Sequence, residues 1–416
     1  MDLLTPRAFF IYRVKPLGCL ITRSCLSFVL IVNCILLAAC RQLAEPALSA
    51  APTYQHYPET SSLAVSTAFG ADGRLWRVVP GKQHVYVDYS TDFGKTFSSP
   101  VQVNSSAQKI KTISEDRPSI AVDNAGRILV IYPAEDAQPL TLFYSISTDH
   151  GQSFSSPKPL SNKAAEANTF EGELLATSSG GVHVFWHDER DRNDWKQPGN
   201  AVYYRYFNDS LDFSSEPLKL ADSLCECCRL ASALDDRQQP LVMARFIYPG
   251  GTRDHGLIKR QGSGQPAVTE RVTFDQWTIE ACPEHGPAIA VDDQGYYHIA
   301  WFTQGAVRQG LFYAYSSDRG RHFSVPMAIG HSERLPGHAD VIAVGKRIFL
   351  SWNEFDGHAS QLQVMQSGDA GKTWSKPQTI AESSAESDFP FLLRYDQHVF
   401  VSWNSKAEGY RLFALP

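Results

Sequence analysis

The chain has 416 residues and carries 38 Lys and Arg against 44 Asp and Glu, a formal net charge of −6. This mildly acidic balance argues against a nucleic-acid partner, which would require a basic surplus on one face. Aromatic residues make up 12% of the chain, so it can bury a large core and is not globally disordered.

The first 39 residues are expected to be an export signal rather than part of the fold. Basic residues precede an apolar run from Phe28 to Leu37, which at about ten residues is too short to span a bilayer, because a spanning helix needs about 20. The run ends in Leu37-Ala38-Ala39-Cys40. Small residues before the cysteine fit a cleavage site, and the alternative is a membrane anchor that happens to contain a cysteine.

This ending resembles the lipobox of bacterial lipoproteins. The resemblance implies that Cys40 becomes the first residue of the mature protein. It also implies that Cys40 carries a lipid that includes palmitate, and that this lipid is the only attachment to the membrane. It also implies a location in the bacterial cell envelope, and Arg41 after the cysteine favours the outer membrane. Residues 40–57 are small, polar and proline-containing, which predicts a tether to a domain over residues 58–416.

A short block of sequence recurs four times in this domain. Each copy reads Ser-x-Asp-x-Gly-x-x-aromatic and follows a segment with strand-like alternation, and the four aspartates are Asp92, Asp149, Asp318 and Asp369. We expect a hairpin turn at each copy, in which the aspartate accepts hydrogen bonds from backbone N–H groups two and three residues further on. The glycine supplies a positive φ, and the aromatic ring packs back between strands. The four aspartates are therefore predicted to be structural.

The block resembles the Asp-box, or BNR repeat, of sialidases and related β-propellers. It lies within a larger repeat, whose second strands end about 50 to 60 residues apart, at Trp76, Tyr132, Trp186, Arg245, Trp301, Trp352 and Trp403. Seven such inner hairpins predict an all-β fold, a β-propeller of seven blades with four antiparallel strands in each. Six blades, the number in the sialidase family, are the alternative.

On a propeller, function is expected at the mouth of the central channel, on the loops that lead into the innermost strands, which we name approach loops. These loops carry more acids, thiols, imidazoles and arginines than turns require. The residues in question are Glu59, Glu115, Asp116, Arg117, Glu171, Glu173, Cys225, Glu226, Cys227, Cys228, Arg229, Cys282, Glu284, His285, His338 and Asp388.

The domain contains four cysteines, all in two neighbouring approach loops: Cys225, Cys227, Cys228 and Cys282. In an exported protein a disulfide is the first expectation, and the bridge most easily drawn joins Cys282 to one of the other three. The alternative is a copper or zinc site made by the four thiols with His285 and His338, because soft thiolates select Cu(I) or Zn. A third possibility is that the thiols are inert.

The Asp-box resemblance also implies what a sialidase site would contain. Sialidases hold the substrate carboxylate with three arginines, for which the candidates here are Arg117, Arg229 and Arg245. Acid–base work would fall to a carboxyl group of raised pKa, and the candidates are Asp116, Glu171, Glu173 and Glu284. The family's Arg-Ile-Pro motif is absent, and no tyrosine nucleophile can be singled out. The alternative for Arg245 is a structural role at the end of an inner strand. The alternative for Arg229 is an ion pair with Glu226 or Glu284.

The Cys-x-Cys-Cys and Cys-Pro-x-x-Gly-Pro motifs resemble those of bacterial exported proteins described as sialidase-like. Three functions remain open. The first is a channel mouth that binds a ligand, either a soft metal ion or a thiol partner. The second is an exo-α-sialidase or related glycoside hydrolase that acts on envelope or host glycans. The third is a scaffold that binds a protein partner across the propeller face and carries a structural disulfide.

Overall fold

The computed structural model describes Tyr57 and residues 62–416, apart from 136–138, 165, 193–198, 209–212, 214, 215, 261, 263 and 264. The expected signal segment, Cys40 and all of the expected tether except Tyr57 lie outside these residues. In the described part of the chain, no helix is long and apolar enough to cross a membrane.

The described residues form 27 β-strands and one 3-10 helix, Ser332–Arg334. The innermost strands are β1 (Ser66–Phe69), β5 (Ser119–Val122), β9 (Thr169–Ala176), β13 (Ala231–Leu234), β17 (Ala288–Val291), β21 (Gly337–Val344) and β25 (Phe391–Tyr395). The second strands are β2 (Leu75–Pro80), β6 (Ile128–Ala134), β10 (Val182–Asp188), β14 (Pro240–Tyr248), β18 (Tyr297–Gln304), β22 (Arg347–Phe355) and β26 (His398–Ser405).

The third strands are β3 (Val85–Ser90), β7 (Thr141–Ser147), β11 (Asn200–Phe207), β15 (Thr252–Lys259), β19 (Gln309–Ser316), β23 (Ser360–Ser367) and β27 (Gly409–Leu415). The outermost strands are β4 (Val101–Gln102), β8 (Lys158–Pro159), β12 (Leu218–Leu224), β16 (Val268–Arg271), β20 (Met327–Ile329) and β24 (Gln378–Ser383). Within the described residues, β27 has no outer neighbour, so the last sheet has three strands.

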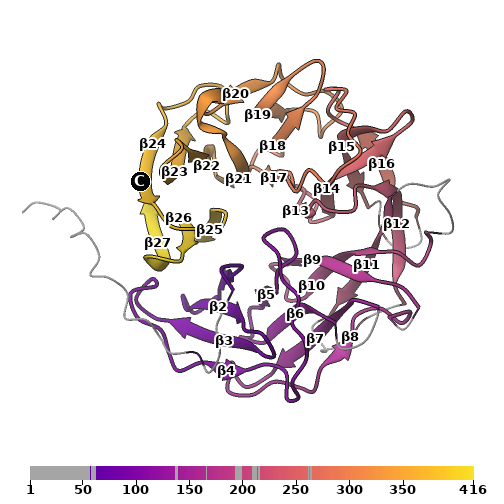
Figure 1. Ribbon diagram of the computed structural model, residues 1–416, viewed down its shortest axis with the longest axis vertical. Coiled ribbons are helices and arrows are strands. Elements are labelled where there is room, and N and C mark those ends of the chain that lie inside the picture. The colour runs from indigo at the N-terminus through magenta and orange to yellow at the C-terminus, as the bar shows by residue number, and fades with distance from the viewer. Residues whose placement is uncertain are drawn as a thin grey trace, which may run out of the picture. The chain divides into compact units, whose positions relative to one another are not determined.

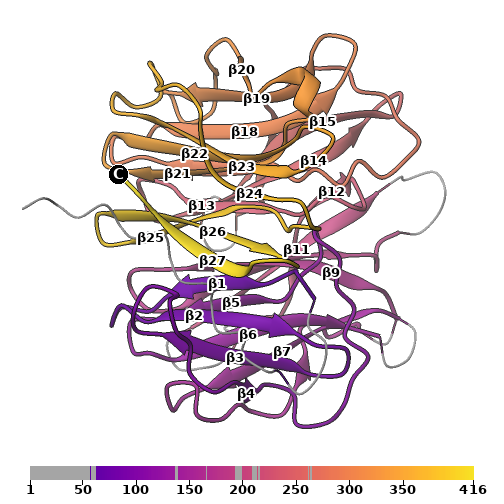
Figure 2. The same cartoon turned by 60° about the vertical axis from the view of Figure 1, so that its left-hand side comes forward.

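The strands form a β-propeller, with the antiparallel sheets arranged around a central axis (Figure 1). Each innermost strand contacts the next one in chain order, and β25 contacts β1, which closes the ring. In the side view the first strands, β1 to β3, lie beside β25 to β27 (Figure 2). One sheet runs through eight strands, but its halves are joined only at the residue pair Leu224 and Phe246. The seven inner hairpins therefore lie where the sequence predicts them.

The core lies between consecutive sheets, where large aromatic side chains are buried. The second strands run past the positions where the sequence predicted them to end, so their tryptophans lie within the strands. These tryptophans are at most 3% exposed: Trp76, Trp186, Trp301, Trp352 and Trp403. Each belongs to a cluster of apolar residues drawn from two consecutive sheets. Burial of such rings stabilises the ring of sheets, because apolar burial contributes roughly 25 cal/mol per Å².

The four Asp-box blocks form tight turns between the third and fourth strands, as expected, but with a different hydrogen-bond pattern. Each box aspartate accepts from the backbone N–H four residues further on, as Asp149 does from Ser153 at 2.9 Å. Asp369 also accepts from the residue three further on, Lys372, at 3.1 Å, as the sequence predicts. The N–H of Gly151 instead donates to the hydroxyl of Ser147 at 2.8 Å. His150 and Gly151 both have positive φ, so two successive left-handed residues shorten the turn and shift the donors along the chain.

Candidate functional site

A cavity of about 290 Å³ lies in the central channel, against the innermost strands β1, β5, β9, β13 and β25 and their approach loops. Its charged lining residues are Glu115, Arg117, Glu171, Glu173 and Arg229, and its apolar wall includes Leu230, Phe391 and Leu392. Four different sheets therefore supply charged or apolar groups to one space. The cavity is the place where the approach loops converge, as the sequence predicts.

A β-bulge in β9 brings two glutamates to this cavity. The pairing of β9 with β10 shifts register between Phe185 and His187, and Glu171 adopts a left-handed backbone with φ 49°. A side chain at Gly172 would meet Ile131, because a Cβ there would lie 2.4 Å from the Ile131 side chain. Bulges commonly re-aim side chains next to functional sites, and here both Glu171 and Glu173 line the cavity.

A related bulge occurs in β21. The pairing of β21 with β22 shifts register between Gly337 and Asp340, and His338 has φ 52°. The segments Glu171-Gly172-Glu173 and His338-Ala339-Asp340 therefore hold corresponding positions in two sheets. Asp340 was not singled out from the sequence, and the correspondence with Glu173 is the signal that would have found it.

The two cavity glutamates differ in their surroundings. Burial raises the pKa of Glu173 to about 7, against a hydrogen bond from the Ser232 hydroxyl at 2.8 Å and the charge of Arg229, both of which lower it. Burial raises the pKa of Glu171 well above its usual value, and the nearby Asp116 raises it further. Burial and a neighbouring acid thus both raise the pKa of Glu171, whereas Ser232 and Arg229 oppose the rise at Glu173.

Arg229 is the cavity arginine with an unused donor. Its side-chain Nη2 donates to the carbonyl of Ala339 at 3.3 Å, and its Nε has no hydrogen-bond partner. Its charge lowers the pKa of both Glu173 and Asp340, against the effect of burial, so the guanidinium lies near both carboxyl groups. Arg229 is therefore placed to neutralise an anion in the cavity.

The other two candidate arginines are occupied by the protein. Arg117 donates through all three of its nitrogens, to the carboxylate of Asp388 and to the carbonyls of Val65 and Ser114. Arg245 is 1% exposed and donates to the carbonyls of residues 253, 285 and 302. Arg245 also lies 4.8 Å from the ring of Trp277 and is not among the residues that line the cavity. Arg229 and Arg245 each have a buried Nε without a hydrogen-bond partner, and of these two arginines only Arg229 lines the cavity.

Two further acids of the approach loops have structural partners. One oxygen of Glu115 accepts from the backbone N–H of Arg229 at 2.9 Å and of Gly286 at 3.1 Å, while the other lies 3.4 Å from Nδ1 of His338. Glu115 thus ties together approach loops of four sheets. Asp116 accepts from the backbone N–H of Glu171 at 2.8 Å, and burial raises its pKa to about 7. Glu284 is exposed and does not line the cavity.

The two histidines predicted as metal ligands lie in a stack of rings instead. The His285 ring packs 4.0 Å from Phe302 and 4.2 Å from His338, and His338 packs 3.4 Å from Phe389, between ring centroids. Burial and the neighbouring histidine lower the pKa of His285 to about 3, so this ring is neutral at ordinary pH. Among the described residues, neither histidine belongs to the group of metal-binding side chains that the cysteines form.

Three of the four domain cysteines form a compact cluster. Cys225 Sγ lies 3.7 Å from Cys227 Sγ and 3.9 Å from Cys228 Sγ, and all three residues are buried. Cys282 is exposed, outside the cluster, and all four are free thiols, so the expected bridge from Cys282 is not formed. The reason is geometric, because Cys282 lies on a surface loop while the other three are buried between sheets.

The cluster has charged neighbours. Nη1 of Arg253 lies 3.0 Å from Cys225 Sγ, a contact that the sequence did not reveal. The pKa of the Cys225 thiol is lowered, because the Cys227 and Cys228 thiols donate to it and Arg253 and Arg245 lie near it. Charge on Cys228 acts on Glu171 in the cavity wall, so the cluster lies directly behind that wall.

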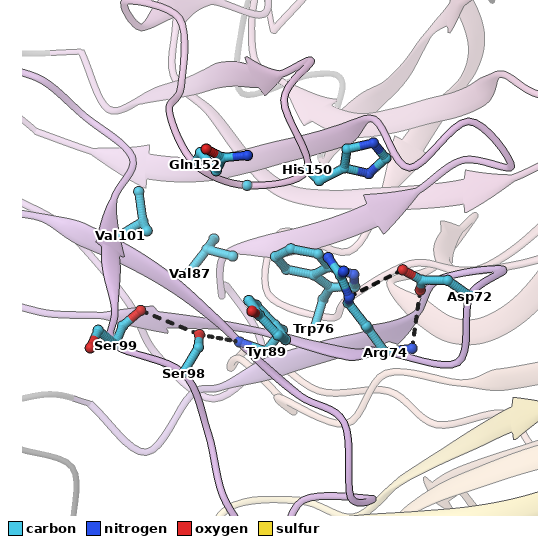
Figure 3. A pocket seen from close by; sticks show the side chains of 11 residues that line it. Asp72, Arg74, Trp76, Val87, Tyr89, Ser98, Ser99, Val101, His150 and Gln152 are labelled. Atoms are coloured by element: carbon cyan, nitrogen blue, oxygen red, sulfur yellow. Dashed lines mark hydrogen bonds and ion pairs between the residues drawn. The ribbon is translucent and has the colours of Figure 1, made fainter.

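A second cavity, of about 500 Å³, reaches the outermost strand β4 and so lies at the rim of the ring. Figure 3 shows the residues that line it. It is bounded by Trp76 and Tyr89 and by the Asp-box turn that carries His150 and Gly151. Its one acid, Asp72, is paired with Arg74 at 3.2 Å. This rim cavity has no second carboxyl group and no unpaired cation, so it lacks the groups for acid–base catalysis that line the channel cavity.

A scan of protein-family models finds none that matches this chain, and no curated protein matches it. Solved structures do match. The Hadza microbial sialidase Hz136 superposes with a TM-score of 0.50 at 15% identity, covering 82% of this chain and 76% of that one. The PL25 ulvan lyase, from a new family of polysaccharide lyases, gives 0.55 at 12% identity, covering 86% and 95%. The same lyase bound to -[GlcA(1-4)Rha3S]- gives 0.55 at 12% identity, covering 87% and 95%. This chain therefore shares its β-propeller fold with glycan-active enzymes, a likeness of fold alone.

Proposed function

We propose that this protein is a glycoside hydrolase whose active site is the channel cavity, with Glu171 as the general acid and Glu173 as the base or nucleophile. Three carboxyl groups line the cavity, of which Glu115 is held by structural partners. The observation that carries the proposal is the other two, Glu171 and Glu173, whose surroundings differ. Cleavage of a glycosidic bond uses such a pair, one carboxyl group protonated and the other ionised.

The surroundings decide which glutamate takes which role. Glu171 is buried beside other acids and keeps its proton, which it donates to the glycosidic oxygen as the carbon–oxygen bond breaks. Glu173 faces Arg229 and Ser232, which favour its ionised form, and its carboxylate assists attack on the anomeric carbon. The proton lost by Glu171 is recovered from water when the cycle closes.

The cavity favours a single terminal sugar that carries an acidic group. A volume of about 290 Å³ is at the lower end of ligand pockets, which span roughly 300–1,000 Å³. The guanidinium of Arg229, which lines the cavity, offers a cation that can pair with a carboxylate, as in a sialic or uronic acid. The names of the sialidase and ulvan lyase that share the fold are consistent with an acidic glycan as substrate.

The test is turnover of fluorogenic glycosides by the purified full chain. A sialoside, a glucuronide and a neutral hexoside should be compared, and we expect hydrolysis of an acidic one. Glu171→Gln and Glu173→Gln should each reduce kcat about 10²–10⁴-fold, while the exposed Glu284→Gln serves as the matched control and retains activity. Absence of turnover with every substrate, or full activity in both cavity variants, would refute the proposal.

We further propose that the enzyme is anchored at the bacterial outer membrane through a lipid on Cys40, which rests on the lipobox-like ending alone. Expression in a bacterium fed labelled palmitate should give a labelled, membrane-bound protein. Cys40→Ser should lose the label and appear in the soluble fraction. A wild-type protein without label would contradict the anchor and leave the enzymatic proposal intact.

A further inference from the structure

The thiol cluster of Cys225, Cys227 and Cys228 plays no part in the proposed hydrolysis. These residues are 0%, 7% and 1% exposed, and their sulfur atoms all lie within 4.8 Å of one another. They come from one approach loop, between β12 and β13, so the loop folds back to direct three thiols at one point. Ordinary packing does not require three convergent thiols.

The sulfur spacing matches that of a metal–thiolate site. The measured separations from Cys225 Sγ are 3.7 Å and 3.9 Å. A metal–sulfur bond of about 2.3 Å places sulfurs about 3.8 Å apart around a tetrahedral ion and about 4.0 Å apart around a trigonal one. Disulfide formation would need the sulfurs to approach to about 2.05 Å.

The charged groups around the cysteine cluster favour a monovalent metal ion over a divalent one. Arg253 contacts Cys225 at 3.0 Å, and the charge of Arg245 acts on both Cys225 and Cys228. Three thiolates and a monovalent cation leave two negative charges, which these two guanidinium groups balance. A divalent cation would leave one positive charge in excess at a buried site, which is unfavourable.

The number of available ligands also favours Cu(I) over zinc. Within the described residues, the grouped metal-binding side chains are the three cysteines and no fourth. Zinc at structural sites takes four ligands, whereas Cu(I) is soft, prefers thiolates and accepts three. We propose that Cys225, Cys227 and Cys228 bind one Cu(I) ion as a three-coordinate thiolate site, with Arg245 and Arg253 as the compensating charges.

Binding is an exchange of protons for the ion. Each thiol that is protonated in the metal-free protein releases its proton as its sulfur coordinates, and copper remains Cu(I) throughout. The site lies behind Glu171 in the cavity wall, but it takes part in no step of the proposed glycoside hydrolysis. Copper binding and hydrolytic activity can therefore fail independently.

The experiment is a Cu(I) titration of the reduced full chain under anaerobic conditions, in competition with a chromogenic Cu(I) chelator. We expect one tightly held Cu(I) per chain and an ultraviolet thiolate-to-copper charge-transfer band. X-ray absorption of the wild-type complex should show about three sulfur neighbours at about 2.3 Å. Cys227→Ser should lose the ion, and Cys282→Ser, at the exposed cysteine outside the cluster, should retain it. Because the chain also holds four cysteines before residue 41, the titration is repeated on a Cys19, Cys25, Cys34 and Cys40 to Ser background.

Several outcomes would overturn the proposal. These are no Cu(I) retained against the chelator, equal loss in Cys227→Ser and Cys282→Ser, or preferential binding of Zn²⁺ with four ligands. Mass spectrometry that finds a disulfide within the cluster of the anaerobically isolated protein would also overturn it. The X-ray absorption result on wild-type protein decides the matter if Cys227→Ser fails to fold, as checked by thermal unfolding.

Discussion

Arg117 and Asp388 form a buried bidentate ion pair, with Nη1 2.8 Å from Oδ2 and Nη2 2.7 Å from Oδ1. Arg117 precedes β5 in the second sheet and Asp388 precedes β25 in the last, so the pair bridges the approach loops on either side of β1. The two side chains are 7% and 3% exposed. This pair therefore helps to hold the ring closed, which explains why Arg117 has no donor left for a ligand.

Removal of one partner should destabilise the ring. Asp388→Ala leaves the Arg117 charge buried without its counter-ion, and we expect a loss of about 3–5 kcal/mol in the free energy of unfolding. Chemical denaturation measures it. Lys163→Ala, which breaks the exposed pair with Glu166, is the control and should cost at most about 1 kcal/mol. Equal losses in the two variants would contradict a role in ring closure.

The pH dependence of hydrolysis tests the roles of the two glutamates. The pKa of Glu173 is raised to about 7, and this group must lose its proton to act, so kcat/KM should rise as pH passes upward through about 7. Arg229→Met removes a positive charge that lowers this pKa, so the rising limb should move to higher pH. A limb that stays in place or moves down would show that Glu173 is not the ionising group.

Gly151 tests the packing of an Asp-box turn. A Cβ at this position would lie 2.5 Å from the Trp76 ring, and the residue has φ 78°. Gly180 has a similar φ of 84° with nothing within 4 Å, so Gly180→Ala reports backbone strain alone. Thermal and denaturant unfolding should find Gly151→Ala less stable than Gly180→Ala by about 1–3 kcal/mol, the usual cost of overpacking. Equal stabilities would mean that the Trp76 ring moves aside without a loss in the free energy of unfolding.

The cysteines should differ in access to an alkylating reagent. Cys282 is exposed while Cys225, Cys227 and Cys228 are buried, so peptide mapping after brief treatment of the native, reduced protein should find Cys282 modified first. Denaturant should expose the other three together, because they share one cluster. Prompt modification of Cys227 in the native state would indicate that the cluster opens to solvent.

Some features of this protein follow from short stretches of sequence. The Asp-box turns and inner hairpins depend on hydrogen bonds and alternation within about a dozen residues, so the repeats predict their number and order. The convergence of Cys225, Cys227 and Cys228 is likewise local to one loop. Even here the structure added a detail, because Asp149 also accepts from a residue four further on, which the sequence did not predict.

Which approach-loop residues remain free to contact a ligand depends on the closed ring of sheets, and the sequence alone does not show it. Arg117 is taken up by Asp388, 271 residues away, and Arg245 by carbonyls of the next sheet. Cys282 and Cys228 lie in neighbouring approach loops, but Cys282 is exposed and Cys228 is buried. The bulge that brings Glu171 and Glu173 to the cavity becomes visible only in the pairing of β9 with β10. The repeat pattern identified the groups near the channel, but their availability depends on partners that are remote in sequence and brought close by closure of the ring.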